Sequence, residues 1–210
     1  MLPLLVSAVL LSNVLAPSTV RDASDAAAQR RQGRLEEVRM RRQEAVENAQ
    51  TQREEFQEKV NQIRSEAKQR VLSNLAERFT SVNEKWVNHW TRVLSRFSEI
   101  LDKMAARIEH IGEQTGKDIT AAMTAIGEAE AAIATAQEAV AAQAGKTYVP
   151  EIDDEATVGV NVRDLVSQFK ADLKETLGHV QVARRAMTDA LSSMKTLAGS
   201  GSEREVEDEE

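Results

Sequence analysis

The chain has 210 residues, of which 29% are charged and only 3% are aromatic, and it contains 9 glycines and 3 prolines. A composition so poor in aromatic residues and helix breakers predicts long α-helices rather than sheets. The absence of cysteine excludes disulfides, thiolate metal sites and cysteine nucleophiles. The formal net charge is −7, and without a basic excess the chain is not predicted to coat nucleic acid.

The N-terminus is an almost continuous apolar run over residues 2–16. A membrane-spanning helix needs about 20 residues, so the run is better suited to the core of a secretory signal, and Val-Leu-Ala at 14–16 resembles a signal-peptidase site. We expect residues 1–20 to be a signal peptide or N-terminal anchor, and the body to be exported to the periplasm, cell surface or medium. No basic residue precedes Arg21. This order leaves open a membrane anchor at residues 2–20 with the body inside the cell, or a true start upstream.

Residues 21–70 interleave acidic and basic side chains and have high helix propensity. Opposite charges four residues apart, such as Glu37 and Arg41, stabilise a solvated helix. We expect a charged helical arm that projects from the body and continues without a break to about Ile111. Glutamates among its arginines argue against binding of nucleic acid. A sparse apolar seam is the predicted contact with a protein partner or a second copy: Leu35, Val38, Phe56, Val60 and Ile63.

Residues 71–198 are the predicted body. Three helices are expected in it, at about 71–111, 119–143 and 161–198. The first has apolar residues at steps of three and four that include both tryptophans, and the second repeats apolar residues as a heptad from Ile119 to Val140. Because the middle helix is the shortest, we expect the irregular segment 144–160 to run in extended form and replace the missing helical turns.

The predicted fold is therefore all-α: an elongated antiparallel three-helix coiled-coil bundle with a long projecting N-terminal charged helix. The last segment, residues 199–210, begins with Gly-Ser-Gly and contains six acidic residues and one arginine. This composition predicts an acidic disordered tail.

No catalytic, cofactor or metal site is predicted. The chain has no glycine-rich dinucleotide motif, phosphate loop or nucleophile elbow. His89 and His110 lie roughly 31 Å apart on one predicted helix, too far to share an ion. The acidic residues of segment 151–155 lack the ligand spacing of a calcium loop. Trp86 and Trp90 are interpreted as core residues rather than as a stacking platform for a ligand.

Two stretches carry a resemblance to known proteins: Asn83-Glu84-Lys85-Trp86-Val87-Asn88-His89-Trp90 with its continuation to Lys103, and residues 139–149. They resemble a group of uncharacterised exported coiled-coil proteins of candidate-phyla bacteria, which are ultrasmall and host-associated. The resemblance covers about residues 71–198, although that group usually has a basic residue before the apolar run. It implies an address outside the cytoplasm and assigns no activity and no functional residues.

These observations predict a non-enzymatic, exported structural or interaction protein with an unidentified protein partner. The alternative is a periplasmic holdase-type chaperone that grips unfolded clients with its helical arms. Membrane contact is expected only through the N-terminal apolar segment, if that segment is not cleaved.

Overall fold

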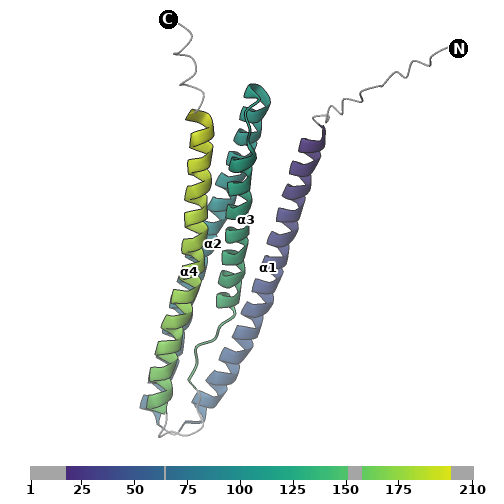
Figure 1. The fold of residues 1–210 in the computed structure, drawn as a ribbon. Coiled ribbons are helices and arrows are strands. Elements are labelled where there is room, and N and C mark those ends of the chain that lie inside the picture. Colours follow the sequence, from purple (N-terminus) through teal and green to yellow (C-terminus); the bar gives the residue numbers. More distant parts are fainter. Residues whose placement is uncertain (1–17, 64, 151–157, 200–210) are drawn as a thin grey trace, which may run out of the picture. The chain divides into compact units, whose positions relative to one another are not determined.

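The computed structural model describes residues 18–63, 65–150 and 158–199, and over these residues the chain is all-helical with no strand. The helices are α1 (Ser18–Asn61), α2 (Glu66–Thr115), α3 (Thr120–Ala144) and α4 (Val158–Gly199) (Figure 1). The predicted all-α class is confirmed. Most of the predicted signal segment and nearly all of the predicted acidic tail lie outside the described residues.

The chain divides into two units, residues 1–37 and residues 38–210, and each is described by itself. In the first unit, residues 18–37 are the beginning of α1. From residue 29 onward its charged side chains are almost all exposed to solvent. The second unit holds the rest of α1 and the other three helices, which form a helical bundle.

The predicted uninterrupted helix through residues 21–111 is wrong, because the chain leaves the helical conformation after Asn61 and α2 begins only at Glu66. The side-chain amide of Gln69 closes this connection: Nε2 donates to the backbone oxygens of Ile63, at 2.8 Å, and Asn61, at 3.3 Å. The last carbonyls of a helix have no partner inside the helix. A side chain from α2 supplies a donor at this end, so the turn forms without glycine or proline.

Residues 38–61 of α1 pack against α2 and do not project from the body. The side-chain contacts between the two helices are Arg42 with Thr91 (3.2 Å) and Asn88 (3.0 Å), Arg53 with Glu84 (3.8 Å), and Gln57 with Ser73 (3.4 Å). Residue numbers rise along α1 while they fall along α2, so the two helices run in opposite directions. The prediction of a projecting arm is therefore wrong for residues 38–61.

α3 packs against both α2 and α4, and five of its nine buried residues are alanine. Ala129, Ala136, Ala183 and Ala190 are completely buried. Small side chains let helix backbones approach closely, and the larger Ile126 and Ile133 fill the space between the alanine positions. The predicted heptad of α3 is buried from Ala122 to Val140, which confirms its assignment to the core.

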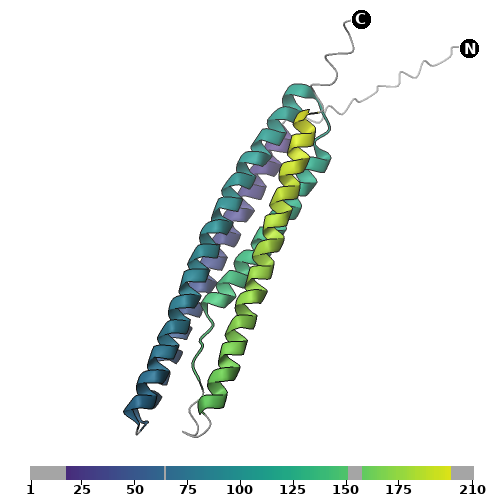
Figure 2. The ribbon, with the colours of Figure 1, turned by 90° about the vertical axis from the view of Figure 1, so that its left-hand side faces the viewer.

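The chain is extended after α3 and lies between α2 and α4 over residues 146–150 (Figure 2). Tyr148 is 4% exposed and packs against Phe79 of α2 and against Leu165 and Phe169 of α4. The ring centroids of Tyr148 and Phe169 are 4.7 Å apart in an edge-to-face arrangement, which aromatic pairs favour. The prediction that this segment replaces missing helical turns is confirmed for residues 146–150, whereas residues 151–157 lie outside the described part of the chain.

A second apolar cluster closes the end of the bundle beyond α3. It consists of Phe56 and Val60 near the end of α1, Ile63 in the turn that follows and Leu72 near the start of α2, with Val149 and Val162 packed against it. α1 therefore contributes core side chains at the level where α3 is missing.

Substitution of Gly145 by alanine tests the close approach between α1 and the end of α3. A Cβ atom on Gly145 would lie 2.5 Å from Cβ and 3.2 Å from Cα of Ala45. The backbone angles of Gly145 suit alanine, so only the clash matters. We expect Gly145→Ala to lower the free energy of unfolding by about 1–3 kcal/mol, as overpacking does, in urea denaturation followed by circular dichroism.

The control for this substitution is Gly127→Ala on the exposed side of α3. A Cβ atom there meets nothing within 4 Å, and alanine in a helix is more stable than glycine by roughly 0.5–1 kcal/mol. If Gly145→Ala stabilised the protein as much as Gly127→Ala does, the contact between Gly145 and Ala45 would be disproved.

Candidate functional site

Most of the predicted interaction seam is used inside the chain. Phe56 is 5%, Val60 is 1% and Ile63 is 9% exposed, and all three belong to the cluster that closes the bundle. They are not available to an outside partner, contrary to the prediction. Leu35 and Val38 are half-buried. The physical reason is the turn after Asn61, which folds this part of α1 onto α2.

The two tryptophans have different surroundings. Trp90 is 3% exposed and belongs to the core, as predicted, whereas Trp86 is 43% exposed, so its assignment to the core is wrong. Their ring centroids are 5.4 Å apart. His89 and His110 are exposed, and the described residues contain no group of three side chains that could hold a metal ion.

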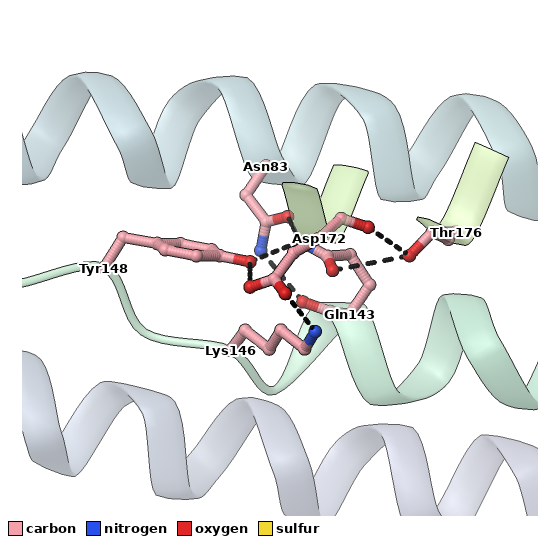
Figure 3. A network of polar contacts seen from close by, with 6 residues as sticks. All are labelled: Asn83, Gln143, Lys146, Tyr148, Asp172 and Thr176. Carbon is pink, nitrogen blue, oxygen red and sulfur yellow. Dashed lines mark hydrogen bonds and ion pairs between the residues drawn. The ribbon is translucent and has the colours of Figure 1, made fainter. Parts of the chain in front are cut away.

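The most distinctive group of polar side chains lies where α3 ends, and sequence reasoning did not predict it. Figure 3 shows side chains from α2, α3, α4 and the extended segment turned toward one another. Four of them are almost completely buried: Gln143 at 0%, Asn83 at 2%, and Thr176 and Tyr148 at 4% exposed. Buried polar groups destabilise a protein unless they are hydrogen-bonded, so their partners decide whether the site is stable.

Asn83 and Gln143 are joined by two hydrogen bonds. Asn83 Nδ2 donates to the backbone oxygen of Gln143 at 3.0 Å, and Gln143 Nε2 donates to Asn83 Oδ1 at 2.8 Å. The first bond gives the Gln143 carbonyl, in the last turn of α3, a second donor beside the backbone N–H of Lys146 at 3.2 Å. The second fixes the orientation of the Gln143 side chain. Together they lock the end of α3 to one position along α2.

The network continues from Gln143 through Tyr148 to the surface. Gln143 Nε2 also donates to the Tyr148 hydroxyl at 2.8 Å, and that hydroxyl donates to Asp172 Oδ2 of α4 at 2.8 Å. Asp172 Oδ1 forms an ion pair with Lys146 Nζ at 2.9 Å. Thr176 donates to the Asp172 backbone oxygen at 3.0 Å and contacts Gln143 Oε1 at 3.4 Å. Every member of the network is thus held by at least one other member (Figure 3).

Burial raises the pKa of Tyr148 far above its ordinary value of 10. The hydrogen bond from Gln143 opposes this shift, because it favours the phenolate, and the nearby Asp172 carboxylate adds to the upward shift. Tyr148 therefore stays neutral and acts as a donor to Asp172 at physiological pH. It is not a base or a nucleophile in this arrangement.

The arrangement holds four segments together. The Gln143 amide nitrogen, the Tyr148 hydroxyl and both Asp172 carboxylate oxygens are used in contacts within the network. Lys146, at 37% side-chain exposure, is its most solvent-exposed end.

The sequence carries one signal for this network. Gln143 follows Val140 by three residues, so it occupies the next position of the α3 heptad that is otherwise filled by isoleucine, valine and alanine. A polar residue at a core position of a heptad fixes register at a cost in stability. The partners Asn83, Tyr148 and Asp172 have no comparable signal, because they come from three other segments.

Comparison with protein-family models, with curated proteins and with solved structures gives no match to this chain. None of the helices in the described part of the chain is both long enough and apolar enough to cross a membrane.

A double-mutant cycle on Asn83 and Gln143 measures how tightly the network is coupled. Gln143→Leu leaves the buried Asn83 Oδ1 without its donor, and we expect a loss of about 1–3 kcal/mol in the free energy of unfolding. Asn83→Leu should cost a similar amount. The double variant removes both partners, so it should cost less than the two single variants together by roughly 1 kcal/mol or more.

The control for this cycle is Gln137→Leu, on the same helix and half-buried, for which we expect a change within about 0.5 kcal/mol. Strictly additive losses for Asn83 and Gln143 in urea denaturation would contradict the network.

Alkaline titration tests the environment of Tyr148, which is the only tyrosine in the chain. Because its pKa is raised in the folded state, the stability it contributes is complete below pH 10 and is lost as the pH rises above the value of the unfolded chain. We expect phenolate absorbance to appear together with the loss of helical circular dichroism. Tyr148→Phe should weaken the pH dependence of stability in this range. Phenolate formation near pH 10 in a fully helical protein would disprove the burial of this hydroxyl.

Proposed function

We propose that the chain is a non-enzymatic, exported structural or interaction protein that works as a helical scaffold. The observation that carries this proposal is the closed polar network at the end of α3. Its donors and acceptors are used to hold α2, α3, α4 and the extended segment together. Such a network specifies one arrangement of helices, which is what a rigid binding surface needs.

We further propose that α2, α3 and α4 form an antiparallel coiled-coil core. The buried heptad of α3 supports this, because its alternation of alanine with isoleucine or valine suits close packing of helices. Residues 38–61 of α1 are an added layer on this core, and Val46 packs directly against its central cluster.

Export is the second half of the proposal. Its support is the apolar run at residues 2–16 and the resemblance of residues 71–198 to exported coiled-coil proteins. Residues 2–16 themselves lie outside the described residues.

The mature N-terminus tests export directly. The full sequence is expressed in a surrogate bacterium, the cells are fractionated, and the chain is analysed by mass spectrometry. We expect a start between residues 17 and 29 in the exported fraction, because a signal peptide is removed during export. An intact apolar segment, with the body protected from external protease, would instead establish an inward-facing anchor and overturn the proposal.

The alternative function is a holdase-type chaperone. Large apolar side chains on the surface favour it, namely Met40 at 66%, Val71 at 64% and Val182 at 54% exposed. The discriminating experiment is aggregation of an unrelated denatured protein in the presence of equimolar purified chain. Suppression of aggregation would support the chaperone function. Unchanged aggregation would exclude it and leave the scaffold function as the proposal.

A further inference from the structure

α2 carries a second line of apolar side chains that is not part of the core. Val82 is 38%, Trp86 is 43% and Ile100 is 46% exposed, and Val93 between them is half-buried. These residues follow one another at steps of four and seven, so they lie along one side of the helix. α4 has a matching line at the same steps, in which Leu177 is 37% and Leu191 is 38% exposed.

The two lines border the same seam between α2 and α4. Leu75, seven residues before Val82, and Val166, seven residues before Leu173, both pack against the cluster of Phe79, Tyr148, Leu165 and Phe169. α2 and α4 are in contact and run in the same direction (Figures 1 and 2). The ring centroids of Phe79 and Phe169 are 4.9 Å apart, which fixes the register. In this register Trp86 is level with Leu177, and Ile100 is level with Leu191.

Basic side chains flank this seam on both helices. On α2 they follow one another at steps of four and seven: Arg78, Lys85, Arg92, Arg96, Lys103 and Arg107. On α4 the flanking residues are Arg163, Lys170, Lys174 and Lys195, and Arg184 lies within the apolar line itself. All of them are exposed, and none is paired with a carboxylate among the described residues. No aspartate or glutamate lies on the α4 flank, and Glu99, seven residues after Arg92 and four before Lys103, is the one acidic residue on the α2 flank, although the whole chain has a net charge of −7.

The charges of α2 are therefore separated by side. Glu84 pairs with Arg53 of α1, and Glu77 and Asp102 lie on the same side of α2 as Glu84. The basic residues, with Glu99 among them, lie on a different side of α2, beyond the exposed apolar line from the buried core. The acidic side of α2 contacts α1, and α1 contributes Arg42 and Arg53 to this contact. The basic side has the opposite charge, which predicts an occupant of the opposite charge.

We propose that the seam between α2 and α4 binds an amphipathic helix with acidic flanks, supplied by a protein partner. A second copy bound through the same face would place two basic surfaces together, which is unfavourable. A helix is narrow enough to reach the apolar line while its acidic residues lie against both basic flanks. Residues 38–61 of α1 show that this bundle accepts a helix laid along α2.

This inference rests on the proposed interaction function but not on export, so its failure is distinguishable from a failure of the export experiment. The probe is a synthetic peptide of four heptads, roughly 42 Å long as a helix, with leucine at positions a and d and glutamate at e and g. Like charges at e and g keep this peptide from pairing with itself. A second peptide with lysine at e and g is the matched control.

Fluorescence of Trp86 reports binding, because the only other tryptophan, Trp90, is buried in the core. We expect the glutamate peptide to bind with micromolar affinity that weakens as salt is added, and to shift the emission of Trp86 to shorter wavelength. The lysine peptide should not bind. Arg92→Glu with Arg96→Glu should weaken binding at least tenfold, and so should Ile100→Ser with Leu191→Ser.

The control substitution is Val182→Ser, at an exposed apolar residue on the other side of α4, which should leave the affinity unchanged. All variants alter exposed side chains, and unchanged urea denaturation shows that they fold. No binding of the glutamate peptide at millimolar concentration, equal binding of both peptides, or binding insensitive to the charge reversals would overturn the proposal.

Two further experiments test whether another molecule or segment binds at the seam between α2 and α4. Vesicles of anionic phosphatidylglycerol that shift the Trp86 emission and are not displaced by the glutamate peptide would show that the face binds lipid, against the proposal. Replacement of Glu207, Glu209 and Glu210 by glutamine in the full chain should leave peptide affinity unchanged. A tenfold gain in affinity would identify the chain's own acidic segment as the occupant and overturn the partner helix.

Discussion

α3 has 25 residues, whereas α2 has 50 and α4 has 42, and this difference in length constrains the rest of the bundle. Beyond Ala144 the apolar sides of α2 and α4 have no third helix between them. Leaving them open would expose a large apolar surface, at roughly 25 cal/mol for each Å². The chain covers them with two unrelated segments, the extended residues 146–150 and the end of α1.

The buried polar network follows from that constraint. A helix that ends inside a bundle leaves carbonyl groups without partners in an apolar environment. The Gln143 carbonyl accepts from Asn83 as well as from the backbone N–H of Lys146, and Gln143 in turn holds Tyr148, the aromatic side chain of the extended segment that replaces the helix. These hydrogen bonds thus hold the end of α3, hold the extended segment that replaces it, and fix the register between α2 and α4. A sequence that changed the length of α3 would have to move the whole network.

The sequence predicts the helices better than their packing. The α3 heptad and the extended role of residues 146–150 follow from periodicity and from helix length, which are local properties. The turn after Asn61 has no glycine or proline, and the Gln69 side chain that closes it is recognisable only once the turn exists. Missing that turn led directly to the wrong assignment of Phe56, Val60 and Ile63 to an outside partner. The sequence does not reveal the polar network either, because its members come from four separate segments.

The assignment of Trp86 to the core is wrong because periodicity shows that α2 has an apolar side but not how the other helices cover it. The apolar arc of α2 is wider than a three-helix bundle needs, and the sequence alone does not say which part of it is buried. The buried part of the arc takes in Val87, Leu94 and Leu101, which belong to the central cluster with residues of α3 and α4, while α1 packs on the acidic side of α2. Val82, Trp86 and Ile100 are left exposed beside a flank of six basic residues that includes one acidic residue, Glu99. One helix thus has two packing sides of opposite charge: α1 occupies the acidic side, and the basic side has the composition that an acidic helix would complement.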